Sequence, residues 1–151
     1  QFLQHLKADM PDEVRDNVFR VKSRINSTWG GNLVDMVRSQ RYLEIIEQEK
    51  LVENAATIGA HLLRGLQALQ ERHTGVLSNA RGRGLMCAID FPDGATRDAV
   101  AKRAYEQGMI ILSCGHRSLR FRPPLDITAA EVDEAIGILD KALASVTARA
   151  A

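Results

Sequence analysis

The chain has 151 residues, enough for one domain with a sizeable core, and its 20 basic and 19 acidic side chains leave a formal charge of +1. No run of like charges occurs, so no nucleic-acid groove and no anionic membrane surface is indicated, and the expected partners are proteins or small molecules. The longest apolar runs are far shorter than the roughly 18 to 20 residues that cross a bilayer, and the N-terminus lacks the apolar core of a secretory signal, which predicts a cytoplasmic protein.

A helical period runs through residues 33–72. Apolar residues recur there mostly at steps of three and four, at Leu33, Met36, Val37, Leu43, Ile46, Ala55, Ile58, Leu62, Leu66 and Leu69. This spacing predicts two helices, or one long bent helix. The sequence His73-Thr74-Gly75 ends the pattern.

The period changes to two after this point. Residues 76–91 alternate loosely and predict one strand that ends at Pro92-Asp93-Gly94. Its core face carries Leu85, Cys87, Ile89 and Phe91. The next helix is expected to have Thr96 as N-cap and to end at Gly108.

Two short strands and a helix complete the chain. Strands are expected at 109–112 and 119–122, with a turn at 113–118 between them and prolines ending the second strand. Thr128 and Glu131 have the spacing of a capping box, which predicts a final helix. That helix should bury Val132, Ala135, Ile136, Leu139 and Leu143.

This order of elements predicts an α/β fold in which helices cover one face of a small, mainly antiparallel sheet. Cys87 and Cys114 are far apart, with no His or second Cys at ligand spacing, so neither a zinc site nor a disulfide framework is indicated. We interpret both as reduced packing residues. No pair of histidines has the spacing of a metal site or a catalytic triad either.

Residues 26–32, NSTWGGN, place hydroxyls and glycines directly before the helical period. A phosphate needs several donors, and the hydroxyls of Ser27 and Thr28 with the backbone N–H groups of Gly30 and Gly31 could supply them. The alternative is an ordinary helix start in which Asn32 or Thr28 caps its own helix.

Two arginine motifs have different interpretations. Residues 81–84, RGRG, would have to open a helix to cradle a phosphate, but they lie in a strand region, so a structural role for the glycines is favoured. In residues 119–122, LRFR, alternation places the two guanidinium groups on one side of a strand, where they could bind a carboxylate. The alternative is a pair of solvated arginines on an edge strand.

These three segments together resemble the C-terminal third of a class III aminotransferase dependent on pyridoxal phosphate. Residues 12 to about 146 follow that family, and residues 1–10 do not. The resemblance implies the small C-terminal domain of the aspartate aminotransferase-like fold, fold type I, over residues 51–151. It also implies an interface loop and a linking helix over residues 11–50, after an unplaced lead-in at 1–10.

The resemblance also implies a homodimer that binds pyridoxal 5'-phosphate. Thr28, with Ser27 beside it, would bind the cofactor phosphate held by the other subunit, and Asn26 would line the substrate pocket. Arg120, three residues before the Pro-Pro step, would bind the substrate carboxylate, while Arg122 has no assigned role. The parent activity would transfer the ω-amino group of L-lysine, or of a similar amine, to 2-oxoglutarate.

The family's Schiff-base lysine should lie upstream of the residues present, so no catalytic residue is assigned and the chain alone is expected to be inactive. A second hypothesis is a non-catalytic α/β remnant that binds a protein partner. Exposed apolar faces on the helices of residues 33–72 would favour that hypothesis.

Overall fold

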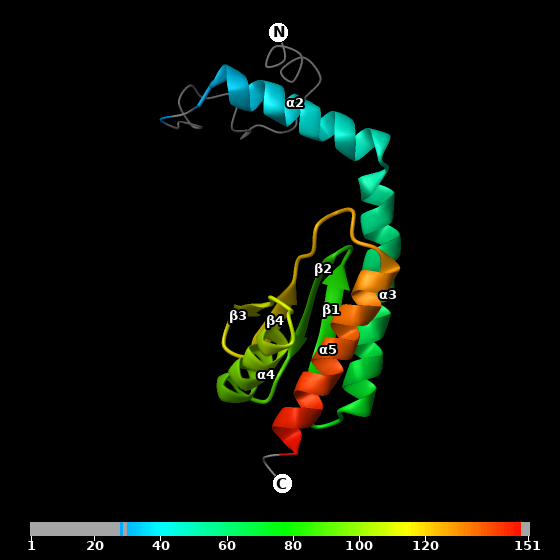
Figure 1. Ribbon diagram of the computed structural model, residues 1–151, viewed down its shortest axis with the longest axis vertical. Helices are drawn as coiled ribbons and strands as arrows, with labels where there is room; N and C mark the ends of the chain where they lie inside the picture. The colour runs from blue at the N-terminus through cyan, green and yellow to red at the C-terminus, as the bar shows by residue number, and fades with distance from the viewer. Residues whose placement is uncertain (1–27, 29, 149–151) are drawn as a thin grey trace, which may run out of the picture. The chain divides into compact units, whose positions relative to one another are not determined.

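The computed structural model describes residue 28 and residues 30–148 (Figure 1). Contacts divide the chain into two units, residues 1–43 and 44–151, and each unit is described by itself. Within the described residues, no helix is long and apolar enough to cross a membrane, and no group of His, Cys, Asp or Glu side chains is arranged to hold a metal ion.

Two separate helices form the first periodic segment: α2 is Leu33–Gln48 and α3 is Leu51–Arg72. The break lies at Lys50, whose φ of 52° and ψ of 42° are left-handed. A residue in this conformation cannot continue a right-handed helix, which decides between the two possibilities that the sequence left open. The end of α3 at Arg72 agrees with the prediction.

The prediction of one strand over residues 76–91 is wrong, because this segment forms a hairpin of two antiparallel strands. These are β1, Ser78–Arg83, and β2, Met86–Asp90. The chain turns at Gly84, whose φ of +54° suits a residue without a side chain. The apolar alternation does not reveal this turn, because the four predicted core residues all follow it. They are buried as predicted: Leu85, Cys87, Ile89 and Phe91.

The remaining two strands are β3, Leu112–Cys114, and β4, Ser118–Phe121, and the sheet order is β1-β2-β4-β3 with antiparallel neighbours throughout. The strand predicted at 109–112 therefore begins and ends too early. Met109 and Ile111 pack against the core without belonging to a strand. The pairing with β4 fixes the true boundaries, since Leu112 is opposite Arg120 and Cys114 is opposite Ser118.

The last two helices are α4, Gly94–Glu106, and α5, Ala129–Thr147. The N-cap of α4 is Asp93 and not Thr96, because the Asp93 carboxylate accepts a hydrogen bond from the Thr96 backbone N–H. Gly108 follows the helix with a φ of +91°, as expected for a glycine at a helix end. The predicted capping box of Thr128 and Glu131 is confirmed at the start of α5.

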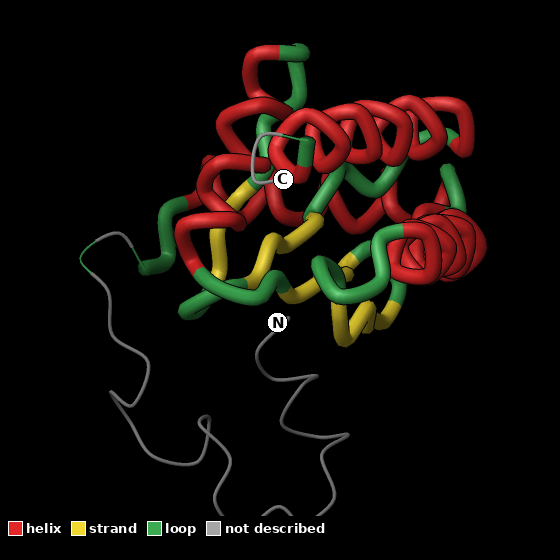
Figure 2. The backbone as a smooth tube through the Cα atoms, turned by 90° about the horizontal axis from the view of Figure 1, so that it is seen from below, coloured by secondary structure: helices red, strands yellow, loops and turns green. Residues whose placement is uncertain are grey.

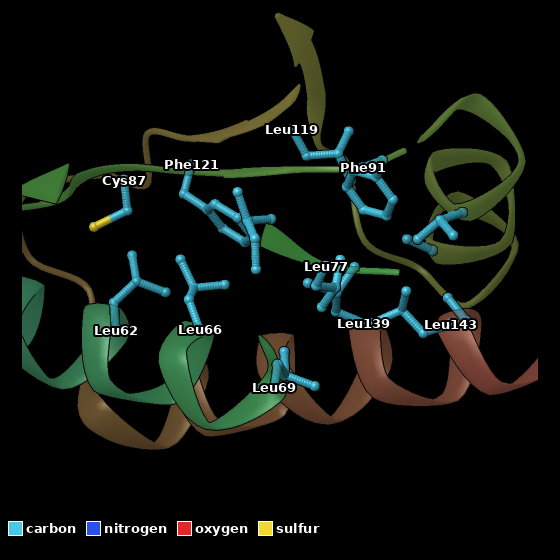
Figure 3. Close-up of a cluster of buried hydrophobic side chains, with 14 of the residues drawn as sticks. Leu62, Leu66, Leu69, Leu77, Cys87, Phe91, Leu119, Phe121, Leu139 and Leu143 are labelled. Atoms are coloured by element: carbon cyan, nitrogen blue, oxygen red, sulfur yellow. The ribbon is translucent and has the colours of Figure 1, made fainter. Parts of the chain in front are cut away.

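One core joins the sheet to the helices α3, α4 and α5. Figure 2 shows the backbone with helices in red and strands in yellow, and Figure 3 shows apolar side chains of this core between the strands and the helices α3 and α5. Val132, Leu139 and Leu143 are buried as predicted, whereas Ala135 and Ile136 are only half-buried. Cys87 belongs to this core, where burial raises the pKa of its thiol, and Cys114 is half-buried.

Candidate functional site

Strand β4 gives its alternate side chains two different environments. Leu119 and Phe121 point into the core and are buried, as the alternation predicts. Arg120 lies between them, half-buried, opposite Ala88 of β2 and Leu112 of β3. Arg122, predicted as a strand residue, lies just beyond the end of β4 and is exposed.

A cavity of about 330 Å³ lies where β4 ends beside β3. We call it the β3–β4 cavity. Apolar side chains from these strands and from α3 and α5 form most of its wall, and both guanidinium-bearing residues of β4 and its continuation also line it. The lining residues are Leu62, Met109, Ile110, Ile111, Leu112, Arg120, Phe121, Arg122, Pro123, Ile127, Val132 and Ala135.

The two arginines of this cavity have no anionic partner among the residues that the structure describes. The Nε atom of Arg120 is buried and makes no hydrogen bond. By contrast, Arg81 and Arg97 are paired with Asp90 and Asp98. An unsatisfied buried N–H is costly, so an acceptor that reached this Nε would be favoured.

The first arginine of residues 81–84 has a structural role instead. Asp90 accepts hydrogen bonds from Ser118 Oγ at 2.6 Å, from Arg81 Nη1 at 2.8 Å and from Asn79 Nδ2 at 2.9 Å. Burial raises the pKa of the Asp90 carboxyl, but the hydrogen bonds from Ser118, Asn79 and Arg81 and the Arg81 charge outweigh it and lower this pKa to about 2. The network ties β1, β2 and β4 together at one end of the sheet.

The glycines of the same segment allow close packing, which confirms their structural interpretation. A Cβ atom on Gly59 of α3 would lie 2.2 Å from the carbonyl carbon of Gly84. A Cβ atom on Gly82 would lie 2.4 Å from the sulfur of Cys87. Helix α3 therefore contacts the hairpin turn backbone to backbone, and no phosphate-binding loop is formed here.

The loop before α2 is described in part. Thr28, Gly30 and Gly31 lie in turns and are exposed, whereas Asn26, Ser27 and Trp29 lie outside the described residues. Asn32 caps α2, because its Oδ1 accepts a hydrogen bond from the Val34 backbone N–H at 3.0 Å. The helix start thus uses Asn32, and the Thr28 hydroxyl makes no hydrogen bond with the described residues.

Thr28 belongs to the unit of residues 1–43 and Arg120 to the unit of residues 44–151, so each stands as a separate partial site. The lysines in the described part of the chain, Lys50, Lys102 and Lys141, are all exposed. None of them lines the β3–β4 cavity or a second cavity beside Asn54 and Thr128.

Two of the histidines join α3 to α5. His61 Nε2 lies 2.6 Å from Asp133 Oδ1, and His73 Nε2 lies 2.6 Å from Asp140 Oδ1. The hydrogen bond with His73 lowers the pKa of Asp140 despite partial burial, and Arg72 acts in the same direction. These histidines support the helix pair and do not line the β3–β4 cavity.

The sequence interpretation missed two features of the β3–β4 cavity. Arg122 received no role, although it lies two residues after Arg120 and lines the same cavity. Ile110 was interpreted as a strand residue, but it lies before β3. Ile110 and Leu112 are 81% and 51% exposed and line the cavity. Their position at a sheet edge would have indicated this role, but the edge is known only once the order of the strands is known.

Comparisons with known proteins agree with this arrangement. The profile of the family described as Aminotransferase class-III matches residues 8–143. L-lysine-epsilon aminotransferase of Amycolatopsis lactamdurans is 56% identical over 134 residues, which cover 88% of this chain and 30% of the relative. The enzyme of the same name from Streptomyces clavuligerus is 51% identical over 136 residues, 89% of this chain and 30% of the relative.

The solved structures agree as well. The structure of lysine aminotransferase from M. tuberculosis in the internal aldimine form matches with a TM-score of 0.80 and 48% identity, covering 89% of this chain and 31% of that one. The chain thus spans about 30% of the length of the curated relatives it matches. The α/β fold with a small antiparallel sheet, expected from the sequence, is confirmed.

Proposed function

We propose that this chain, which belongs to the class III aminotransferase family, is the C-terminal part of an aminotransferase. The enzyme would transfer the ω-amino group of L-lysine, or of a similar amine, to 2-oxoglutarate. The observation that supports this proposal is the free Arg120 guanidinium at an apolar cavity, since both substrates carry carboxylates. The identity of 56% to a lysine aminotransferase favours lysine as the amino donor.

Arg120 would bind the substrate carboxylate. Its guanidinium presents a planar set of donors that match the two carboxylate oxygens, and the cavity beside it is lined mostly by apolar groups. Such a contact orients the substrate without taking part in bond breaking. Asn26 would line the substrate pocket of the complete enzyme.

Thr28 and Ser27 would bind the phosphate of pyridoxal 5'-phosphate in the second subunit of a homodimer. Thr28 fits this role because its hydroxyl is exposed and is not used to cap α2. Structures have been solved for two variants of an M. tuberculosis protein, one with an Asn→Ala and one with a Thr→Ser substitution. The two substituted positions are two residues apart, as Asn26 and Thr28 are in this chain. The shared spacing supports a binding role for both Asn26 and Thr28.

Bound pyridoxal phosphate supplies the electron sink for the reaction at the substrate carbon. The residues present would hold the phosphate and the substrate carboxylate, while the lysine that anchors the cofactor and moves the proton would lie upstream. The exposure of the described lysines supports this division. We therefore expect the isolated chain neither to retain the cofactor nor to transaminate.

A chimeric enzyme tests the proposal. Residues 12–146 of this chain would replace the matching stretch of the A. lactamdurans enzyme, and lysine-dependent amino transfer to 2-oxoglutarate would be measured. We expect activity, with Thr28→Ala weakening cofactor binding about tenfold, the effect of losing one hydrogen bond to a charged group. Arg120→Gln should raise the KM for 2-oxoglutarate by more than about tenfold.

Controls separate this function from a purely structural role. Arg83→Gln changes an exposed arginine of β1. It should change neither the dissociation constant of the cofactor nor the KM for 2-oxoglutarate. A folded chimera that is inactive toward lysine, ornithine and 4-aminobutyrate would contradict the proposal. It would favour the second candidate, a protein-binding module, for which the observation is the exposed apolar side chains of α2.

A further inference from the structure

The chain between β4 and α5 passes beside the first turn of α3 (Figure 1). We call residues 123–127 of this connection the Pro-Pro loop. We propose that Asn54 of α3 is a positioning residue, whose carboxamide fixes the Pro-Pro loop as a wall of the β3–β4 cavity and so sets the KM for 2-oxoglutarate. This inference rests on the proposed function and adds to it a residue that does not line the β3–β4 cavity itself.

The Pro-Pro loop has few backbone hydrogen bonds of its own. Pro123 and Pro124 have no N–H group to donate. Within the loop, the Ile127 N–H donates to the carbonyl oxygen of Pro124 at 3.3 Å, which closes a single turn. The carbonyl groups of Leu125 and Ile127 take their donors from another element.

Asn54 supplies these donors. Its Nδ2 lies 2.7 Å from the Leu125 carbonyl oxygen and 3.1 Å from the Ile127 carbonyl oxygen. A carboxamide nitrogen carries two N–H groups, so Asn54 gives both of them to the loop. Among the described residues, no other side chain donates a hydrogen bond to residues 123–127. Asn54 is therefore the side chain that ties the loop to α3.

Open space lies on two sides of the Pro-Pro loop. Pro123 and Ile127 line the β3–β4 cavity, and Ile127 also lines the second cavity, of about 450 Å³, beside Asn54. Ile127 packs against the edge of the core, but Leu125 and Asp126 are exposed. A segment with few packed neighbours opens easily unless hydrogen bonds hold it. The two bonds from Asn54 are thus a main restraint on the loop.

A displaced wall should affect substrate binding and not the chemical step. If the loop occupies its observed position only part of the time, the apparent affinity falls in proportion to that fraction. Arg120 keeps its place, because β4 pairs with β2 on one side and with β3 on the other. Loss of the Asn54 carboxamide should therefore raise KM and leave kcat nearly unchanged.

Two substitutions at Asn54 in the chimeric enzyme test the effect on binding. Asn54→Ala removes the carboxamide, and Asn54→Asp keeps its shape but has no N–H to donate. Each should raise the KM for 2-oxoglutarate about fivefold, the effect of losing roughly one net hydrogen bond. The kcat of each should stay within about twofold of the unsubstituted chimera, because the bound state still forms.

Gln70→Ala is a matched control on the same helix. Gln70 Oε1 accepts a hydrogen bond from the Ala80 N–H at 2.8 Å, so this carboxamide ties α3 to β1. It lines neither of the two cavities. Gln70→Ala should lower the melting temperature of the chimera while the KM for 2-oxoglutarate stays unchanged.

Hydrogen exchange in the 151-residue chain tests the loop without any enzyme assay. The Ile127 amide is the reporter, because it donates to Pro124 inside the loop. We expect this amide to exchange about fivefold faster in Asn54→Ala than in the unsubstituted chain, since the loop opens more often. In Gln70→Ala its exchange rate should not change.

An Ile127 exchange rate that is the same with and without the Asn54 carboxamide would overturn the inference. Equal KM values for Asn54→Ala and Gln70→Ala would also overturn it, as would a fall in kcat as large as the rise in KM. A folded chimera that is inactive toward lysine contradicts the proposed function instead, and the exchange rate then decides whether Asn54 fixes the loop.

Discussion

At the residue scale, Asp90 is the clearest case of a polar group that the fold must satisfy. Its side chain is 9% exposed and accepts hydrogen bonds from two residues of β1 and one of β4. Its pKa of about 2 in the folded chain lies below the ordinary 3.8, so the ionised form is favoured by folding. Its contribution is complete above the ordinary pKa and is lost as the pH falls from about 4 toward 2.

We predict that Asp90→Asn destabilises the chain by about 2 kcal/mol near neutral pH, the value that corresponds to this pKa difference. Urea unfolding of both proteins between about pH 7 and pH 2.5 measures the free energy of unfolding. The difference should shrink as the pH falls below about 4. Asp126→Asn, at an exposed carboxylate, is the control and should show no such trend. A difference that does not vary with pH would show that the charge of Asp90 is not what stabilises the sheet.

Single residues of the site could be predicted to different extents. Thr28 and Arg120 were identified because the loop and the strand motif resemble a family, and the structure shows that the Thr28 hydroxyl is exposed and that the Arg120 Nε is unpaired. Their proposed ligands remain predictions. Arg122 was left without a role, since its place at the cavity depends on where β4 ends and on how β3 pairs with it.

At the element scale, the contact between α3 and the β1–β2 turn depends on two glycines. A Cβ atom on Gly59 would overlap the backbone of Gly84, and backbone atoms cannot rotate away as a side chain can. We predict that Gly59→Ala destabilises the chain by about 3 kcal/mol or prevents folding, as overpacking in a tight contact does. Thermal unfolding followed by circular dichroism measures the change.

Gly137 on α5 gives a matched control. It is also a helical glycine, but a Cβ atom there would meet nothing within 4 Å. Gly137→Ala should therefore stabilise the chain by about 0.5 to 1 kcal/mol through helix propensity. Equal effects of the two substitutions, in either direction, would rule out the close contact of α3 with the turn.

The N-cap of α4 differs between the sequence prediction, Thr96, and the structure, Asp93. If Asp93 is the N-cap, Asp93→Ala removes the acceptor for the Thr96 N–H and should lower the melting temperature by a few degrees. Thr96→Ala leaves that backbone donor in place and should have a smaller effect. The reverse order of the two melting temperatures would restore Thr96 as the cap.

The elements show which signals are local. The capping box of α5 was predicted correctly because its partners, Thr128 and Glu131, lie within one helical turn. The boundaries of β3 were wrong because its register is set by β4 and not by its own residues. The β1–β2 turn was missed because β1 carries no apolar alternation of its own and all four predicted core residues lie after the turn.

At the scale of the whole molecule, the described apolar surface is uneven. The core of residues 44–151 gathers α3, α4 and α5 on the sheet, whereas α2 has no buried residue. Leu33 and Val37, one helical turn apart on α2, are 76% and 68% exposed. Adjacent exposed apolar side chains on one helix face favour association with another protein surface.

We predict that the chain self-associates through α2 in a concentration-dependent way, and that Val37→Gln weakens this association about tenfold, the effect of losing one buried valine at the contact. Size-exclusion chromatography with light scattering over a range of concentrations measures it. Val52→Gln makes the same change at a valine of α3 that is 66% exposed, and it should leave the association unchanged. A chain that stays monomeric at every concentration would show that the exposed apolar side chains of α2 do not drive assembly. Equal effects of the two substitutions would show that the apolar face of α2 is not the contact.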